Sequence, residues 1–388
     1  MGLRSVVAGS LRGQTSAMAD RDLLLPKTGQ GSARTDPSSD LAKLPGMPPS
    51  GYRALALSGT EYARRVLRGD AAILEVPVGS FLADLAMALR PHFFALSSVA
   101  ALAGASAVSS VISPRILLAA AIGGLGWGVG QLLNDLLDRE ADRVNAPDRA
   151  IAAGRLPAGP TLVIAALLGV ALAVGTALVH PLAWLLAIAA SSMIVAYNAA
   201  KRWPLLGNVA HGALMATAAA IGASAALPRE ADPMAYLRGL FGAWRTLLFV
   251  GAIAAWYLQS NYEKDRPGDR AAGYVTLAAL LSVRASAILR AVALASIGVL
   301  AHASGALPDP ISTSTMAAGV VVGLASTIEP IAKSTDEAAL RGYRAAVPAS
   351  ILAMLALAAP LLGRWGTTAT LVVALALVAA AFRRSSNP

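Results

Sequence analysis

Two short segments of the chain share one arrangement of acidic and basic residues that could bind a metal ion. Residues 138–143 and 265–270 both read D-R-x-x-D-R, so each carries two aspartates four residues apart. Carboxylate oxygens suit hard cations, and Mg²⁺ is usually held by one or two carboxylates together with substrate phosphates. Both segments are therefore candidate sites for Mg²⁺ and a phosphorylated substrate.

The first segment extends backward and gains a third oxygen ligand. Asn134, Asp138 and Asp142 follow one another at intervals of four residues. On a helix this spacing places side chains on one face, about 6 Å apart along the axis. We expect the three side chains to point toward one bound cation.

The second segment is expected to differ in local structure. Pro267 and Gly268 interrupt helices, so we expect Asp265 and Asp269 to project from a turn. Alternatively, both segments are solvated loops whose surface ion pairs stabilise little. The recurrence of one pattern among only 22 acidic residues favours a site and suggests two related halves.

A third segment supplies positive charge. Tyr197, Lys201 and Arg202 close an apolar stretch. Basic residues at such a point often only anchor a helix at the membrane surface, but lysine also binds phosphate as a point charge. We expect Lys201 to face the two acidic segments.

The composition indicates which kind of fold must position these residues. Of the 388 residues, 56% are hydrophobic and 14% are charged, and the mean hydropathy is +0.60. A soluble protein carries roughly 25% charged residues, so the chain is predicted to be a membrane protein. The net charge of +10 comes from residues in short gaps between apolar runs, which fits lipid headgroups better than nucleic acid. The chain has no cysteine, so thiolate metal sites and disulfides are excluded.

The apolar residues form runs of the length that a spanning helix needs, about 20 residues. Residues 1–85 are instead rich in Ser, Gly, Pro and Arg and are predicted to be a disordered cytoplasmic tail, with a transit peptide as the alternative. Basic residues gather after the even-numbered runs, so these exits and the amino terminus are predicted to be cytoplasmic. The abundance of Arg and Ala suggests a bacterial source and hence the inner membrane. The runs lie near residues 93–112, 116–133, 161–179, 182–200, 205–228, 246–262, 286–306, 311–328, 345–363 and 365–382.

At these segments the sequence resembles the UbiA-type family of intramembrane prenyltransferases. The family motif N-D-x-x-D-x-x-x-D matches 134–142, Y-x-x-x-K matches 197–201, and a second D-x-x-x-D matches 265–269. The likeness covers roughly residues 80–365. The chain differs from many members at Ala150 and Ala278, where they have Pro, and at Tyr262, where they have an acid.

The resemblance implies an all-α membrane fold. It predicts nine transmembrane helices around a central cavity, with a cytoplasmic cap formed by the motif loops. Residues 86–364 would form this domain, and 365–388 would add a tenth helix and a short tail.

The resemblance also implies an activity: Mg²⁺-dependent transfer of an isoprenyl group from a prenyl diphosphate to a lipophilic acceptor within the membrane. The partners would be the donor, the acceptor and membrane lipids, with no nucleic acid. Asp138, Asp265 and Lys201 are the expected catalytic residues. The expected metal ligands are Asn134, Asp138, Asp142, Asp265 and Asp269, and the expected diphosphate-binding residues are Arg143, Arg149, Tyr197, Lys201 and Arg270.

Two other functions stay open. A phosphoribosyl-type member of the family would transfer a sugar phosphate to a lipid phosphate. A transporter would also have half-repeats and intramembrane acids, but its acids should lie near the middle of the spans. The CDP-alcohol phosphotransferases need D-G-x-x-A-R before their acidic motif, and nothing similar precedes Asp138 or Asp265.

Overall fold

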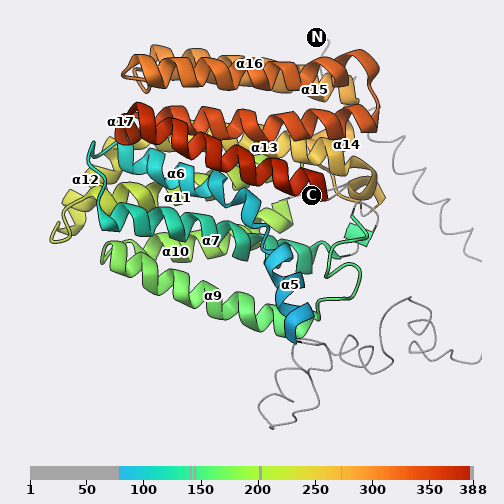
Figure 1. The fold of residues 1–388 in the computed structure, drawn as a ribbon, viewed down its shortest axis with the longest axis horizontal. Coiled ribbons are helices and arrows are strands. Elements are labelled where there is room, and N and C mark those ends of the chain that lie inside the picture. Colours follow the sequence, from blue (N-terminus) through green and yellow to red (C-terminus); the bar gives the residue numbers. More distant parts are fainter. Residues whose placement is uncertain (1–77, 140–141, 144–145, 201–202, 272, 385–388) are drawn as a thin grey trace, which may run out of the picture. The chain divides into compact units, whose positions relative to one another are not determined.

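The computed structural model describes residues 78–139, 142–143, 146–200, 203–271 and 273–384, which all belong to one compact unit. Every regular element among them is a helix, which confirms the all-α prediction (Figure 1). The elements are α5 (Val78–Ala88), η3 (Pro91–Phe93), α6 (Phe94–Ser106), α7 (Pro114–Leu137), α9 (Ala158–Val179), α10 (Trp184–Ala200), α11 (Leu206–Ala226), α12 (Pro233–Gly242), α13 (Trp244–Ala271), α14 (Leu277–Leu280), α15 (Val283–Ala303), α16 (Pro310–Lys333) and α17 (Asp336–Arg384).

Three helices begin with the same local signal, a short polar residue followed by proline. Ser113, Asp232 and Asp309 each accept a hydrogen bond from a backbone N–H of the first turn of α7, α12 and α16. Such caps satisfy N–H groups that lack partners within the helix, and proline fits the first turn because it has no N–H to satisfy. The three helices all begin at the same end of the unit, where α12 lies, opposite to α14 (Figure 1).

The centre of the unit depends on close contact between α6 and α11. A Cβ atom added at Gly104 would overlap the backbone of Ala219, and one added at Gly222 would overlap the backbone of Ala101. Without a hydrophobic driving force between helices in lipid, such backbone contact through small residues is a main source of packing energy. The two glycines thus bring α6 and α11 together beside α13 and α17, which pack on them.

Helix α13 corrects one expectation about the second acidic segment. Its helical structure continues through Pro267 and Gly268 to Ala271, so Asp265 and Asp269 project from a helix and the predicted turn is wrong. Proline removes only one backbone hydrogen bond when neighbouring elements hold the helix. Here the side chains of Arg266 and Asp269 on either side are buried.

Helix α17 consists of two arms. Gly363 has non-helical dihedral angles (φ 62°, ψ 179°), and the second arm, residues 364–384, runs back beside the first (Figure 1). Phe382 of the second arm meets the ring of Tyr343 at 6.5 Å between centroids. This second arm corresponds to the predicted tenth apolar run.

The described helices fit a membrane protein. Among the described residues, seven helices are long and apolar enough to cross a membrane, or eight if α12 and α13, bent by 57°, count as one span. Helix α10 is apolar but shorter, with 17 residues. The number of nine or ten spans therefore stays a prediction. The predicted tail, 1–85, lies outside the described residues up to position 77, and its last part belongs to α5.

Candidate active site

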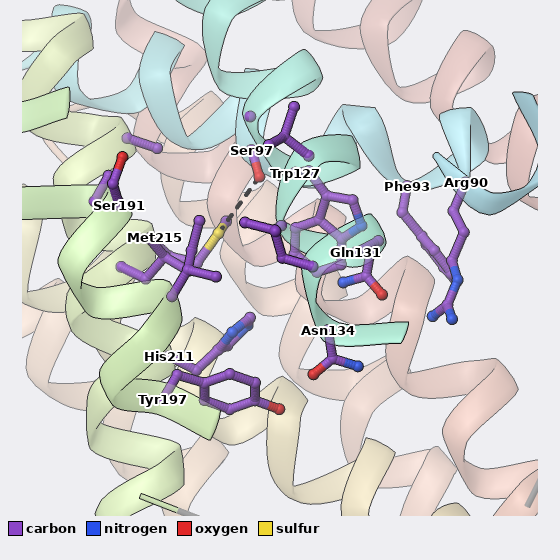
Figure 2. A pocket seen from close by; sticks show the side chains of 18 of the residues that line it. Arg90, Phe93, Ser97, Trp127, Gln131, Asn134, Ser191, Tyr197, His211 and Met215 are labelled. Carbon is purple, nitrogen blue, oxygen red and sulfur yellow. Dashed lines mark hydrogen bonds between the residues drawn. The ribbon is translucent and has the colours of Figure 1, made fainter. Parts of the chain in front are cut away.

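A chamber of about 520 Å³ lies among helices α6, α7, α9, α10, α11 and α13. Its walls are mostly apolar, and polar side chains collect at one end. Figure 2 shows Asn134, Gln131 and the hydroxyl of Tyr197 toward this end, and Ser191 and Met215 farther away. The chamber can thus hold a molecule with a long apolar part and a polar head.

The first acidic segment lies at the polar end, where Asn134, Asp138 and Asp142 all line the chamber. Helix α7 ends at Leu137, but the backbone N–H of Asp138 donates to Asn134, and that of Asp142 to Asp138, at 2.8 Å each. These helical bonds keep the three side chains in a row, as their spacing predicts. Asp138 and Asp142 are both buried.

Two arginines hold this cluster together. Arg149 bonds to Asp142 and lies 3.7 Å from Asp135, and Arg90 bonds to Asp135 at 2.6 Å. Both arginines line the chamber. Burial by itself would lower the pKa of Arg149, but the carboxylates of Asp135 and Asp142 outweigh it and raise the pKa. Burial raises the pKa of Asp142, and Arg149 partly opposes that rise.

The second acidic segment reaches the same end of the chamber. Asp265 and Asp269 both line it. The carboxylate of Asp265 accepts hydrogen bonds from Lys264 at 2.8 Å and from Asn261 at 3.3 Å. Asp269 accepts one from Thr276 at 3.4 Å. Helix α13 therefore presents two carboxylates to the chamber that also contains the first segment.

Tyr274 joins the two segments directly. Its hydroxyl donates to Asp138 at 3.0 Å, and its backbone N–H donates to the carbonyl of Asp269 at 2.8 Å. One residue of the loop after α13 thus contacts both acidic segments. No local sequence pattern marks Tyr274. The recurring D-R-x-x-D-R pattern pointed to the pairing of the segments but not to the residue that bridges them.

The remaining predicted site residues do not all line the chamber. Tyr197 lines the chamber beside His211, with 5.8 Å between ring centroids. The exposed Arg270 donates to the carbonyl of Ala279, and neither it nor the exposed Arg143 is among the lining residues. Lys201 lies outside the described residues. Arg90, to which no role was assigned from the sequence, does line the chamber; its signal was the segment Arg90-Pro91-His92 before the first apolar run, which resembles the opening of the family domain.

Among the residues that the structure describes here, protein groups alone do not form a metal cage. Within the described parts of the chain, no three side chains of His, Asp or Glu are close enough together to hold a metal ion. Two pairs of aspartates and one asparagine nevertheless face the same chamber, one pair from α13 and the other ligands from the end of α7 and the segment that follows it. This donor set suits a hard cation that shares its coordination with water and a bound phosphate.

Comparisons with known proteins agree with this geometry. The family model described as the UbiA prenyltransferase family matches residues 93–347. A digeranylgeranylglyceryl phosphate synthase of Methanoculleus marisnigri is 33% identical over 206 residues, covering 51% of this chain and 68% of that protein. Another, from Methanothrix thermoacetophila, is 29% identical over 211 residues, covering 53% of this chain and 74% of that protein.

The fold is also similar to a solved structure. The apo structure of a UbiA homologue from Aeropyrum pernix K1 is 19% identical, with a TM-score of 0.57, and the match covers 73% of this chain and 98% of that one. With the family match over most of the helical unit, these likenesses confirm the resemblance seen in the motifs. The chain belongs to the UbiA prenyltransferase family and is an integral membrane prenyltransferase.

Proposed function

We propose that the protein transfers an isoprenyl group from a prenyl diphosphate to a lipophilic acceptor inside the membrane, with Mg²⁺ as cofactor and pyrophosphate as the product that leaves. One observation carries this proposal. In a mostly apolar chamber of a membrane protein, both acidic segments and two arginines meet at one end. Such a chamber matches a substrate with a diphosphate head and a hydrocarbon tail.

The residues present fit Mg²⁺. Asn134, Asp138 and Asp142 would hold one ion, and Asp265 with Asp269 would hold another. When bound, the ions would stabilise the charge that develops on the departing pyrophosphate. Ligands that come partly from the diphosphate agree with the lack of a closed protein cage in the described parts of the chain.

The chain's own cations would bind the rest of the diphosphate. The guanidinium groups of Arg149 and Arg90 are held in place by carboxylates on one side and line the chamber on the other. A guanidinium can bind phosphate oxygens with two parallel hydrogen bonds. Fixed positive groups stabilise a leaving anion without reorganising during the reaction. We propose that Lys201 and Tyr197 also bind the diphosphate, as the family motif implies.

The walls of the chamber would hold the reacting chain and exclude water. Apolar residues of α9, α10 and α11 line most of its length. Trp127 and Tyr257 also line the chamber, with 6.3 Å between their ring centroids. Water that reached an allylic carbocation would convert the donor to an alcohol, so a dry chamber protects the transfer.

The names of the relatives indicate which acceptor class to test first. Two of them are named digeranylgeranylglyceryl phosphate synthases. We therefore place a lipid that carries a glycerol phosphate first among the acceptors to test, ahead of aromatic acids and quinone precursors. The positive charge after the even-numbered runs further supports placing the polar end of the chamber at the cytoplasmic face of the membrane.

The test measures pyrophosphate release by the purified protein in mild detergent. Donors of several chain lengths are combined with Mg²⁺ and with each acceptor class, and the lipid products are identified by mass spectrometry. Asp138→Asn should abolish release, whereas Asp148→Asn, at an exposed aspartate of the same loop, should not. Folded wild-type protein that releases no pyrophosphate with any donor would refute the proposal, and the phosphoribosyl donor would be tested next.

A further inference from the structure

A buried ion pair lies behind the chamber, on the far side of α13. The Nε atom of Arg290 in α15 is 2.9 Å from Oε1 of Glu263 in α13, and their side chains are 1% and 0% exposed. Neither residue lines the chamber. Ionisable groups inside a membrane protein are costly and usually serve a function, so this pair needs an explanation other than substrate binding.

Hydrogen bonds extend the pair to other helices. Oε1 of Glu263 also accepts from Ser286 at 2.6 Å, and the Ser286 hydroxyl accepts from Gln259 at 2.7 Å. The Nη1 atom of Arg290 donates to Ser326 of α16 at 3.3 Å. The pair therefore ties one turn of α13 to α15 and α16.

The network continues to α11. Gln259 accepts a hydrogen bond from Asn208 at 3.2 Å, and Asn208 also donates to the carbonyl of Ala255. Trp256 donates to the carbonyl of Arg290 at 2.9 Å. Helices α11 and α15 thus hold α13 by direct polar contacts in the stretch just before Asp265, and α16 joins the network through Arg290.

One face of α13 contacts the polar network, and the opposite face lines the chamber. Glu263 and Asp265 are two residues apart, which is a rotation of about 200° on a helix with 3.6 residues per turn. They therefore lie on nearly opposite sides of α13, the first in the network and the second in the chamber. The residues of α13 that line the chamber are Tyr257, Leu258, Asn261, Tyr262, Asp265 and Asp269.

Pro267 explains why α13 needs the polar network around Glu263. In a helix the N–H of residue 267 would donate to the carbonyl of Glu263, four residues earlier, and proline has no N–H. The helix is therefore weakest at the turn that carries Asp265 and leads to Asp269. The side chain of Glu263 fixes α13 to its neighbours at the start of that turn.

The pair is poorly arranged for stability alone. Within the described residues, Oε2 of Glu263 and Nη2 of Arg290 are buried without a hydrogen-bond partner. The attraction within a buried ion pair offsets the loss of hydration only when the remaining polar atoms of the pair also form hydrogen bonds. The buried charges of Glu263 and Arg290 are therefore better explained by the position that they give to α13 than by a gain in stability.

We infer that Glu263 and Arg290 are positioning residues that hold the last turns of α13 so that Asp265 and Asp269 face the first acidic segment across the chamber. The inference rests on the proposed function, since it concerns the metal and diphosphate site. It predicts that breaking the pair weakens metal binding at the second acidic segment although neither residue touches the site.

The test compares Glu263→Gln, Arg290→Lys and a matched control, Glu329→Gln. Glu329 forms ion pairs with Lys333 and Arg341 on the exposed surface of α16 and α17. Three quantities are measured for each: the Kd for Mn²⁺ by electron paramagnetic resonance, the Mg²⁺ concentration at half-maximal pyrophosphate release, and the Tm.

Loss of a residue that orients metal ligands typically weakens metal binding about 10- to 100-fold. We expect about a tenfold increase in both metal-dependent quantities for Glu263→Gln and a smaller increase for Arg290→Lys. The KM for the acceptor should not change, and Glu329→Gln should match the wild type in all measurements.

The outcomes separate this inference from the proposed function. Folded Glu263→Gln protein that binds Mn²⁺ as the wild type does would overturn the inference and leave the proposed function intact. Wild-type protein that neither binds Mn²⁺ nor releases pyrophosphate would overturn both. If both pair variants unfold, the pair is only structural, and the positioning role is also overturned.

Discussion

Replacing Arg149 with glutamine tests the polar end of the chamber most directly. The guanidinium bonds to Asp142 and lies 3.7 Å from Asp135, and its side chain is 13% exposed. Asp135 keeps its hydrogen bond to Arg90 at 2.6 Å in the variant. Asp142 loses its bonded cation, and within the described residues its second oxygen is already buried without a hydrogen-bond partner.

The size of the effect follows from these contacts. Removing one preorganised donor that stabilises a developing negative charge typically slows a reaction about 100- to 1,000-fold. Arg90 still lines the chamber beside Asp135, so the lower end, about a 100-fold decrease in pyrophosphate release, is expected. The KM for the donor should rise as well, because the same guanidinium would bind the diphosphate.

The pH dependence gives an independent check. Burial raises the pKa of Asp142, and Arg149 partly opposes this rise. Without Arg149 the pKa should rise further, so the carboxylate becomes protonated at a higher pH as the pH falls. The acid limb of the pH–rate profile should move to higher pH in Arg149→Gln and stay unchanged in Arg155→Gln, where an exposed arginine of the same loop is replaced. Near wild-type rates with an unshifted acid limb would refute this reasoning.

Four further outcomes are expected. Asp138→Asn and Asp265→Asn should each slow pyrophosphate release at least about 100-fold with an unchanged Tm, and a normal rate in both would remove these residues from the site. A chelator should abolish release, and added Mg²⁺ should restore it; activity that persists in excess chelator would exclude the metal. Tyr274→Phe loses the hydrogen bond to Asp138 and should raise the Mg²⁺ concentration at half-maximal rate about tenfold, measured by titration. Gly104→Val should lower the Tm because its side chain would overlap a neighbouring backbone, whereas Gly79→Ala, with open space at its Cβ, should leave it unchanged.

Local sequence patterns predicted the features of the fold that depend on neighbouring residues. The apolar runs predicted the helices because a spanning segment must be long and apolar whatever it packs against. The spacing of Asn134, Asp138 and Asp142 predicted their shared orientation because helical geometry fixes it. These features need no knowledge of how the chain folds back on itself.

Features that depend on tertiary contacts were not predictable in this way. Pro267 suggested a turn, but packing of the buried residues beside it keeps α13 helical. The family resemblance implied that Arg270 binds the diphosphate; its guanidinium donates to the carbonyl of Ala279, and the residue is not among those that line the chamber. Arg90 reaches the acidic cluster from 45 residues away, a pairing that no local spacing reveals.

The reversal of α17 at Gly363 brings the described part of the chain, which stops at Arg384, back toward the end of the unit where α14 lies. The first arm runs from the α14 end of the unit to the α12 end, and the second arm returns (Figure 1). A reporter enzyme fused after Pro388 is therefore expected on the same side as the acidic segments. A fusion after Leu362, which lacks the second arm, should place the reporter on the opposite side. Activity of the two fusions in whole cells would show whether the second arm crosses the bilayer, and equal activity would mean that it does not.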